Sequence, residues 1–569
     1  MPSVLTSRLV GARRTGHPSW PAAARWPLLL VLPLLVSACI SVTQQAEPGA
    51  TVTPSEVPSV AIASASPGPS LAVSVTPSPV PTASPRLLPA PSEVVGFLPS
   101  WLLADAAQAL DSDLLTMLAF HGVEASADGR LVGAKPSGDV PDGWAALGSD
   151  EFTKLKEQLQ AAGVRVVLVI QRFGWSDDLL ERTRTLLTTK PDRRALAGRI
   201  ATLVEERGLD GVNLDVEPVP EDLADEYVTF VREVRRALDE VDPELHLSVD
   251  VVASLTGYDL AGLTAEGAAD LAILMGYNYR TDGAPVAGST APLHDEASGD
   301  LATSVEQALA QAPGEKLVLA LPWYARAWST DSDGAGAATI EGRDVEGPAS
   351  PSYAETVAQA MLSGRNYDPV QASAWTAYPS RSCATCPATW RQAWYDDPDG
   401  FGAKIDHALE QGLSGVGMWA IGYEAGREEL WWALRERVHP RADDAPPNGS
   451  AALDPDTIRG DVEGRDVVQG SASLRLFASD GDDGSGLLLA RIGLDDALDE
   501  DGALVTGRSY PATDRIEFAL ADEETGGSPE SGPRSVHVQW RDLAGNWSVP
   551  IVIEVHVLDP VASTTPEDL

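Results

Sequence analysis

Leu209-Asp-Gly-Val-Asn-Leu-Asp-Val-Glu-Pro218 is the stretch that decides how this chain folds, because polar and apolar side chains alternate along it. Such alternation predicts a β-strand, in which every second side chain points to the same face. Asn213, Asp215 and Glu217 therefore share one face. Two steps of strand rise separate the Cα atoms of Asp215 and Glu217 by about 7 Å, so each carboxyl group disturbs the proton affinity of the other.

A helix is predicted directly before this strand. Apolar residues recur there at helical spacing, and Gly208 follows them as a C-terminal cap: Leu196, Ile200, Leu203 and Val204. The order helix, tight turn, strand is typical of a βα alternation, whose strands are covered by helices on one side and face a barrel interior or a second helical layer on the other. Asp215 and Glu217 are then withdrawn from water, which is costly for unpaired acids and favours a functional role over a solvated sheet face.

This stretch resembles the DGxDxDxE signature of family 18 glycoside hydrolases, in the Asn-containing variant of spore-cortex-lytic N-acetylglucosaminidases. Further segments are similar to the first, third, fifth, sixth, seventh and eighth strands of that family and occur in its order: residues 93–101, 164–175, 247–253, 275–278, 316–328 and 415–423. The resemblance covers about residues 93 to 437. It implies an α/β fold, a (β/α)8 TIM barrel with a small insertion between strands 7 and 8.

The resemblance also implies a chemistry. Family 18 enzymes are retaining and substrate-assisted, so the 2-acetamido oxygen of the sugar is the nucleophile and the substrate must carry N-acetyl groups. Carried over position by position, Glu217 is the general acid and base. Asp215 orients the acetamido group and stabilises the oxazolinium intermediate, and Tyr277 donates a hydrogen bond to the acetamido oxygen.

Four more residues are predicted to bind the substrate. Trp419 matches the indole under the sugar ring, and Met275 matches a wall of the same pocket. Asn213 and Asn278 stand where many relatives have Asp. We expect Asn213 to hydrogen-bond Asp215 without sharing a proton with it. No cofactor and no metal are expected.

The third-strand segment departs from the family pattern. Many members have a Ser-x-Gly-Gly element there, whereas this chain reads Ile170-Gln-Arg-Phe-Gly-Trp175. Arg172 is interpreted as facing an anionic group of the substrate, such as the lactyl carboxylate of muramic acid in peptidoglycan.

The N-terminus predicts export. Arg13, Arg14 and Arg25 precede the apolar run 27–38, which is too short to span a bilayer but suits a signal peptide. Leu35-Val-Ser-Ala-Cys39 resembles a bacterial lipobox, which implies that Cys39 is lipidated and anchors the protein to the outer face of the cell membrane. An ordinary signal peptide with an incidental cysteine is the alternative.

The chain divides into five predicted parts. They are a lipoprotein signal peptide (1–39), a disordered Pro/Ser/Thr-rich tether (40–92), the barrel (93–440), a linker (441–459) and an all-β sandwich (460–569). Five short alternating strands support the sandwich: residues 474–478, 487–492, 516–520, 536–540 and 551–557. Its last hairpin resembles those of immunoglobulin-like or fibronectin-like modules. Asp480, Asp482 and Asp483 fit an acidic turn better than a calcium site, because EF-hand spacing is absent.

The net charge of the chain and its cysteines limit the ligands and metal ions that it is expected to bind. A net charge of −42 makes nucleic acid an unfavourable ligand. Cys383 and Cys386 are expected to form a local disulfide. A zinc site would need two more ligands, and a redox motif is disfavoured by the neighbouring prolines.

Two classes of function follow. One is a hydrolase, expected to be monomeric, that cleaves β-1,4 bonds next to N-acetylglucosamine in peptidoglycan or chitin-like polymers. The other is a non-catalytic, lectin-like barrel. Retention of Glu217 favours the hydrolase, because family-18-like lectins typically lack that residue. A third alternative is a surface adhesin in which the sandwich binds and the barrel is a spacer.

Overall fold

The computed structural model of the protein describes residues 90–135, 137–440, 443–481 and 484–568. The predicted signal peptide, Cys39 and nearly all of the predicted tether lie outside this range. None of the helices in the described residues combines the length and apolarity that crossing a bilayer requires.

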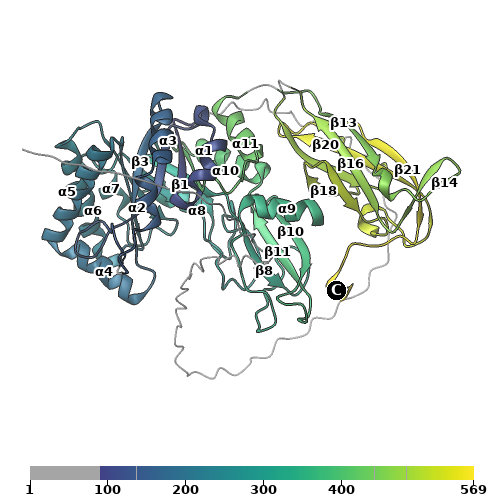
Figure 1. Cartoon of the computed structure of the whole chain (residues 1–569), viewed down its shortest axis with the longest axis horizontal. Coiled ribbons are helices and arrows are strands. Elements are labelled where there is room, and N and C mark those ends of the chain that lie inside the picture. The colour runs from purple at the N-terminus through teal and green to yellow at the C-terminus, as the bar shows by residue number, and fades with distance from the viewer. Residues whose placement is uncertain (1–89, 136, 441–442, 482–483, 569) are drawn as a thin grey trace, which may run out of the picture. The chain divides into compact units, whose positions relative to one another are not determined.

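Eight parallel strands close into a barrel in the order β1-β12-β7-β6-β5-β4-β3-β2, which confirms the predicted TIM barrel (Figure 1). The strands are β1 (Glu93–Pro99), β2 (Met117–Glu124), β3 (Arg165–Phe173), β4 (Gly211–Glu217), β5 (His246–Val252), β6 (Leu271–Met275), β7 (Leu317–Pro322) and β12 (Gly415–Trp419). Gly211 opens β4 at φ 154°, and a Cβ there would lie 2.1 Å from the backbone oxygen of His246. Only glycine lets these two strands approach so closely.

Helices cover the outside of the barrel (Figure 1). They are α1 (Leu103–Ala109), α2 (Asp142–Leu147), α3 (Asp150–Ala161), α4 (Asp177–Thr188), α5 (Lys190–Arg207), α6 (Ala224–Asp239), α7 (Leu260–Leu263), α8 (Leu301–Leu309), α10 (Pro398–Glu410) and α11 (Glu429–Val438). Helix α9 (Tyr353–Ser363) instead lies between β8 and β9 in sequence and packs against β10 and β11. The predicted helix before β4 is α5, and Gly208 ends it in the left-handed conformation at φ 57°. Glycine adopts that conformation without a steric cost, so the chain turns directly into β4.

The barrel interior is largely apolar, and its buried polar residues concentrate on β4 and β5. An inner cluster of buried apolar side chains comes from β1, β2, β3, β6 and β7: Val95, Phe97, Met117, Ala119, Val167, Val169, Leu271, Ile273, Val318 and Ala320. The corresponding positions of β4 and β5 are polar and buried: Asn213, Asp215, Ser248 and Asp250. Buried polar groups are costly unless they are paired, so this sector of the barrel is specialised for something other than packing.

The predicted insertion between the last two barrel strands is a four-stranded sheet in the order β8-β11-β10-β9. Its strands are β8 (Arg326–Thr330), β9 (Asn366–Asp368), β10 (Ser373–Ser380) and β11 (Thr389–Tyr395). Lys404 on α10 fastens this sheet to the barrel. Its ammonium group, 0% exposed, forms an ion pair with Asp396 and donates to Ser373 Oγ at 3.0 Å.

Two further sheets follow the barrel in sequence and share one apolar core. One contains β13 (Asn448–Leu453), β16 (Ala472–Ser479) and β19 (Arg515–Phe518). The other contains β14 (Asp461–Val462), β15 (Arg465–Gln469), β21 (Ile551–Leu558), β20 (Gly532–Asp542), β17 (Leu487–Gly493) and β18 (Arg508–Pro511). The five predicted strands correspond to β16, β17, β19, β20 and β21. Strand β13 lies within residues 441–459, predicted as a linker, and pairs with β16.

Candidate active site

The three polar residues of β4 lie on its inward face, as their alternation predicts. Asn213 is 0% exposed and Asp215 5% exposed, while Glu217 is partly exposed at the last position of the strand. Val212, Leu214 and Val216 pack outward into the core under the helices. The carboxyl ends of TIM-barrel strands are where the active sites of such enzymes are built.

Asn213 does not make the hydrogen bond that we expected. Its Nδ2 donates to Ser248 Oγ at 3.1 Å and to Asp250 Oδ1 at 2.8 Å, both on β5. Oδ1 of Asn213 and Oδ1 of Asp215 are buried without a hydrogen-bond partner among the described residues. The reason is the packing of β4 against β5, which places two acceptors beside the amide. Asp215 is thereby left with an unsatisfied oxygen.

Three carboxyl groups therefore lie inside one sector of the barrel, and burial controls their protonation. Burial raises the pKa of Asp215 to about 6, and a hydrogen bond with Glu217 works in the opposite direction. Burial, followed by the charge of Asp215, raises the pKa of Glu217 well above its usual range. Burial and the charge of Asp215 do the same to Asp250. Repulsion from the Asp215 charge makes Glu217 hold its proton more tightly as Asp215 ionises, which favours the protonated state that a general acid requires.

Tyr277 lies two residues beyond β6 and close to Asp215 and Glu217. Burial raises the pKa of its phenol well above the usual range, and the charges of Glu217, Asp250 and Asp215 add to that effect. The phenol is therefore protonated and able to donate. Its ring meets that of Tyr324 edge to face, with centroids 6.1 Å apart.

The other predicted binding residues are divided between the barrel mouth and its rim. Met275 is the buried last residue of β6. Trp419 is the half-buried last residue of β12. Asn278 is exposed, with a left-handed φ of 64°, and its Oδ1 accepts from Tyr324 Oη at 2.8 Å and from Arg326 at 3.1 Å. Asn278 therefore ties the chain after β6 to the start of the inserted sheet.

His121, at the inward face of β2, was not predicted to belong to the site. Its Nε2 lies 3.8 Å from Asp215 Oδ2, and its ring meets Trp419 edge to face with centroids 5.0 Å apart. The side chain is buried, and burial lowers its pKa to about 4. The sequence held one signal for His121. It follows Met117 and Ala119 at alternate positions of β2, and both of those side chains point into the barrel.

The prediction for Arg172 is wrong. Its guanidinium is 3% exposed and donates to Leu179 O at 3.2 Å and to Ala125 O at 3.3 Å, outside the barrel under α4. The inward residues of β3 have odd numbers, as Val167 and Val169 show, so residue 172 points the other way. Arg172 therefore gives no reason to prefer an anionic substrate.

The cysteine pair forms the expected disulfide, Cys383–Cys386. It closes a short loop between β10 and β11 of the inserted sheet, away from the barrel mouth.

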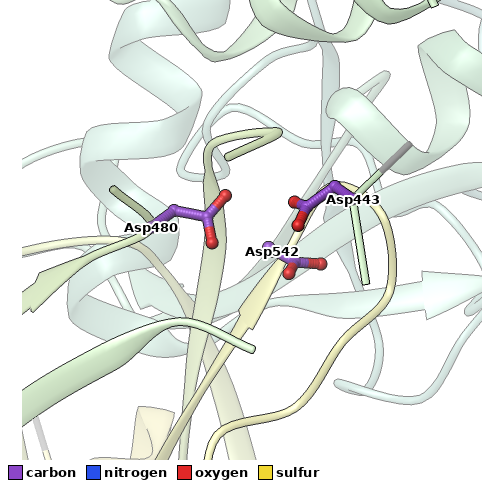
Figure 2. Close-up of side chains that lie close together, drawn as sticks. All are labelled: Asp443, Asp480 and Asp542. Carbon is purple, nitrogen blue, oxygen red and sulfur yellow. The ribbon is translucent and has the colours of Figure 1, made fainter. Parts of the chain in front are cut away.

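A second group of acids lies beside the other sheets. Figure 2 shows Asp443, Asp480 and Asp542 with their carboxyl groups turned toward one another, and oxygens of all three lie within 4.8 Å. Most of these oxygens accept backbone N–H groups: Asp443 from Ser485, Asp480 from Gly486 and Asp542 from Asn546. Asp480 is thus bonded as an acidic turn residue would be. Asp482 and Asp483 lie outside the described residues.

The chain is similar to known proteins in both sequence and fold. The family model described as glycosyl hydrolases family 18 matches residues 93–424. The putative sporulation-specific glycosylase YdhD of Bacillus subtilis is 23% identical over 309 residues, which are 53% of this chain and 66% of that protein. The probable di-N-acetylchitobiase 2 of Dictyostelium discoideum is 25% identical over 257 residues, covering 41% of this chain and 66% of that protein. The chain thus spans just under two thirds of the length of these relatives.

Solved structures share the barrel. A family GH18 chitinase from Cycas revoluta in complex with allosamidin has a TM-score of 0.51 at 20% identity and covers 61% of this chain and 99% of its own. A chitinase-like agglutinin from Robinia pseudoacacia has a TM-score of 0.50 at 20% identity and covers 60% and 99%. These likenesses establish the fold, which an enzyme and an agglutinin have in common.

Proposed function

Because the chain belongs to glycosyl hydrolases family 18, we propose that it is an exported hydrolase that cleaves β-1,4 linkages next to N-acetylglucosamine in peptidoglycan or chitin-like glycans. One observation carries this proposal. Asp215 and Glu217 lie side by side on the inward face of β4, where burial and the Asp215 charge favour a protonated Glu217. The relatives named as a glycosylase and a chitobiase are consistent with this substrate class.

In the first step, Glu217 donates its proton to the glycosidic oxygen as the bond to the anomeric carbon breaks. The acetamido oxygen of the same sugar attacks that carbon from the other face and forms an oxazolinium ion. The Asp215 carboxylate stabilises the positive charge, and the Tyr277 phenol orients the acetamido oxygen. The face of Trp419 supports the apolar face of the sugar ring.

In the second step, the ionised Glu217 accepts a proton from water, and the water oxygen attacks the anomeric carbon. The oxazolinium ring opens, the acetamido group is restored, and Glu217 is protonated again. Two inversions at one carbon give net retention of configuration.

The test is replacement of Glu217 by Gln, with Glu221→Gln as the matched control. Glu221 is an exposed glutamate four positions further along the chain. We expect Glu217→Gln to reduce hydrolysis of N-acetylglucosamine oligomers by about a hundred- to ten-thousandfold, the usual contribution of a general acid, and Glu221→Gln to have little effect. Mass spectrometry of the products from chitin oligomers and from purified sacculi identifies the polymer and the bond. Full activity in Glu217→Gln would refute the proposal.

A non-catalytic lectin is the second candidate, because the agglutinin shares this fold at a TM-score of 0.50. The two functions differ in one measurement. A lectin binds N-acetylated oligosaccharides without releasing products, whereas the hydrolase releases products with the wild-type chain and only binds with Glu217→Gln.

We also propose that the protein is a lipoprotein on the outer face of the membrane, since Cys39 ends a lipobox-like segment. The wild-type chain should fractionate with membranes, and Cys39→Ala should be released into the soluble fraction. An unchanged distribution of the variant would rule out the lipid anchor.

A further inference from the structure

Asn213 supplies no hydrogen bond to Asp215, although the two share one face of β4. Both N–H groups of the Asn213 amide are directed at Ser248 and Asp250, and Asp215 Oδ1 has no partner among the described residues. A charge buried without a donor is unstable, yet the proposed reaction needs Asp215 ionised beside a cationic intermediate. The donor must therefore come from another strand.

We propose that His121, from β2, is a positioning residue that donates a hydrogen bond from its imidazole to the Asp215 carboxylate during the reaction. This inference rests on the proposed function. His121 Nε2 lies 3.8 Å from Asp215 Oδ2. Catalytic hydrogen bonds are often long before substrate binds and tighten in the complex, and a small rotation of the Asp215 carboxyl closes this one.

The surroundings of His121 hold its ring in place and leave its N–H group available for a hydrogen bond. The residue is 4% exposed, and neither ring nitrogen has a partner among the described residues, which is unusual for a buried imidazole. Three aromatic rings hold it in place, with centroids 5.0 Å away for Trp419, 5.9 Å for Trp101 and 6.2 Å for Phe173. Because these neighbours are uncharged and burial lowers its pKa to about 4, His121 is neutral at neutral pH and carries one N–H.

Other titratable groups face Asp215 from several elements. Glu217 lies on the same strand, Asp250 on β5 and Tyr277 beyond β6, while the phenols of Tyr227 and Tyr258 lie behind β4. Glu217 already hydrogen-bonds Asp215, but it must release its proton in the first step. His121 Nε2 lies 3.8 Å from Asp215 Oδ2 and can donate to this carboxylate when Glu217 is ionised. It therefore keeps Asp215 charged at the stage when the oxazolinium ion needs a counter-ion.

The kinetic test is His121→Phe, which preserves an aromatic ring among the three neighbours and removes both nitrogens. We expect kcat to fall by about ten- to a hundredfold, the usual worth of a hydrogen bond to a charged group, with KM changed less than about threefold. Loss of the donor also disfavours the charged form of Asp215, so the acidic limb of the pH profile should move up by about one pH unit.

The matched control is His246→Phe. His246 is 5% exposed at the first position of β5, the opposite end of the barrel from Glu217. Its loss should lower thermal stability and leave the acidic limb in place. An unchanged acidic limb in His121→Phe would show that His121 only packs and would overturn the inference.

A second measurement does not depend on turnover. The ring nitrogens of His121, observed by nitrogen-15 NMR in the wild-type chain, should shift as Asp215 titrates, and Asp215→Asn should abolish that response. Ring nitrogens that do not respond to Asp215 would refute the contact. Absence of hydrolysis by the wild-type chain would instead refute the proposed function and leave this measurement to decide the role of His121.

Discussion

Replacing Asp215 by Asn should make the barrel more stable while it abolishes activity. Asp215 is 5% exposed, and burial raises its pKa from the ordinary value of 3.8 to about 6. The folded barrel therefore binds the Asp215 proton more tightly than the unfolded chain does, and ionising the carboxyl in the folded state is unfavourable. A pKa difference of this size corresponds to about 3 kcal/mol, at about 1.4 kcal/mol per unit.

The direction of the Asp215 pKa shift decides the pH range in which the stability of the barrel changes. Between about pH 4 and pH 6 the unfolded chain has already lost the proton that the folded barrel still holds, so stability of the wild type falls as the pH rises. Asp215→Asn has no such proton. The variant should match the wild type near pH 4 and exceed it by up to about 3 kcal/mol at pH 7.

The assay is urea unfolding of both chains at a series of pH values, followed by circular dichroism at 222 nm. All of the α-helices in the described residues belong to the barrel or to its insertion, and none to the two sheets that follow, so this signal reports unfolding of the barrel unit. Asp222→Asn is the control, because Asp222 is exposed and its pKa is lowered by a hydrogen bond from Arg184. The free energy of unfolding of Asp222→Asn should not exceed that of the wild type at neutral pH. A stability difference between Asp215→Asn and wild type that stays constant from about pH 4 to pH 7 would refute the argument from burial.

Three further outcomes are expected. In a pH-rate profile, kcat/KM should fall below about pH 6 as Asp215 takes up its proton, and on the alkaline side as Glu217 loses the proton that it donates. Trp419→Ala should lower kcat/KM for N-acetylglucosamine oligomers by about ten- to a hundredfold, measured by initial rates, and Trp419→Phe should recover most of the loss because it restores a flat apolar surface. Lys404→Met should destabilise the barrel by about 3 to 5 kcal/mol in urea unfolding, because it leaves the carboxylate of Asp396 buried without its cation.

Much of the fold could be predicted from short sequence patterns. The alternation in residues 209–218 identified β4 and the shared face of Asp215 and Glu217, and the structure has both. The ordered segments identified the barrel. In the all-β part, β13, β14, β15 and β18 were not predicted. Strand β13 lies in the Pro/Asp/Ala-rich stretch that was interpreted as a linker, and β14 has two residues, both exposed, and carries no periodicity that a sequence could show.

The partners of Asp215 could not be predicted, because they lie on other strands. His121 lies in a largely apolar strand, and Asp250 follows His246 and Ser248 at alternate positions of β5. Alternation within a strand tells only which face each one takes. Which residues meet inside a barrel depends on the stagger between strands, and the sequence does not encode that stagger in any local pattern. The expected bond from Asn213 to Asp215 failed for this reason, since β5 brings Asp250 and Ser248 within reach of the same amide.

The buried ion pair between Lys404 and Asp396 has a mechanical consequence. The inserted sheet begins at Arg326, which contacts Asn278 at the rim of the barrel, and swinging that sheet aside would separate the pair. Separating the two charges gives up their attraction and the hydrogen bond from Lys404 to Ser373, which disfavours such a movement. The inserted sheet is then a rigid part of the barrel rim and not a segment that opens and closes. A polysaccharide bound as proposed would meet a barrel rim that does not move aside, so loosened or single chains should be cleaved well before tightly stacked ones.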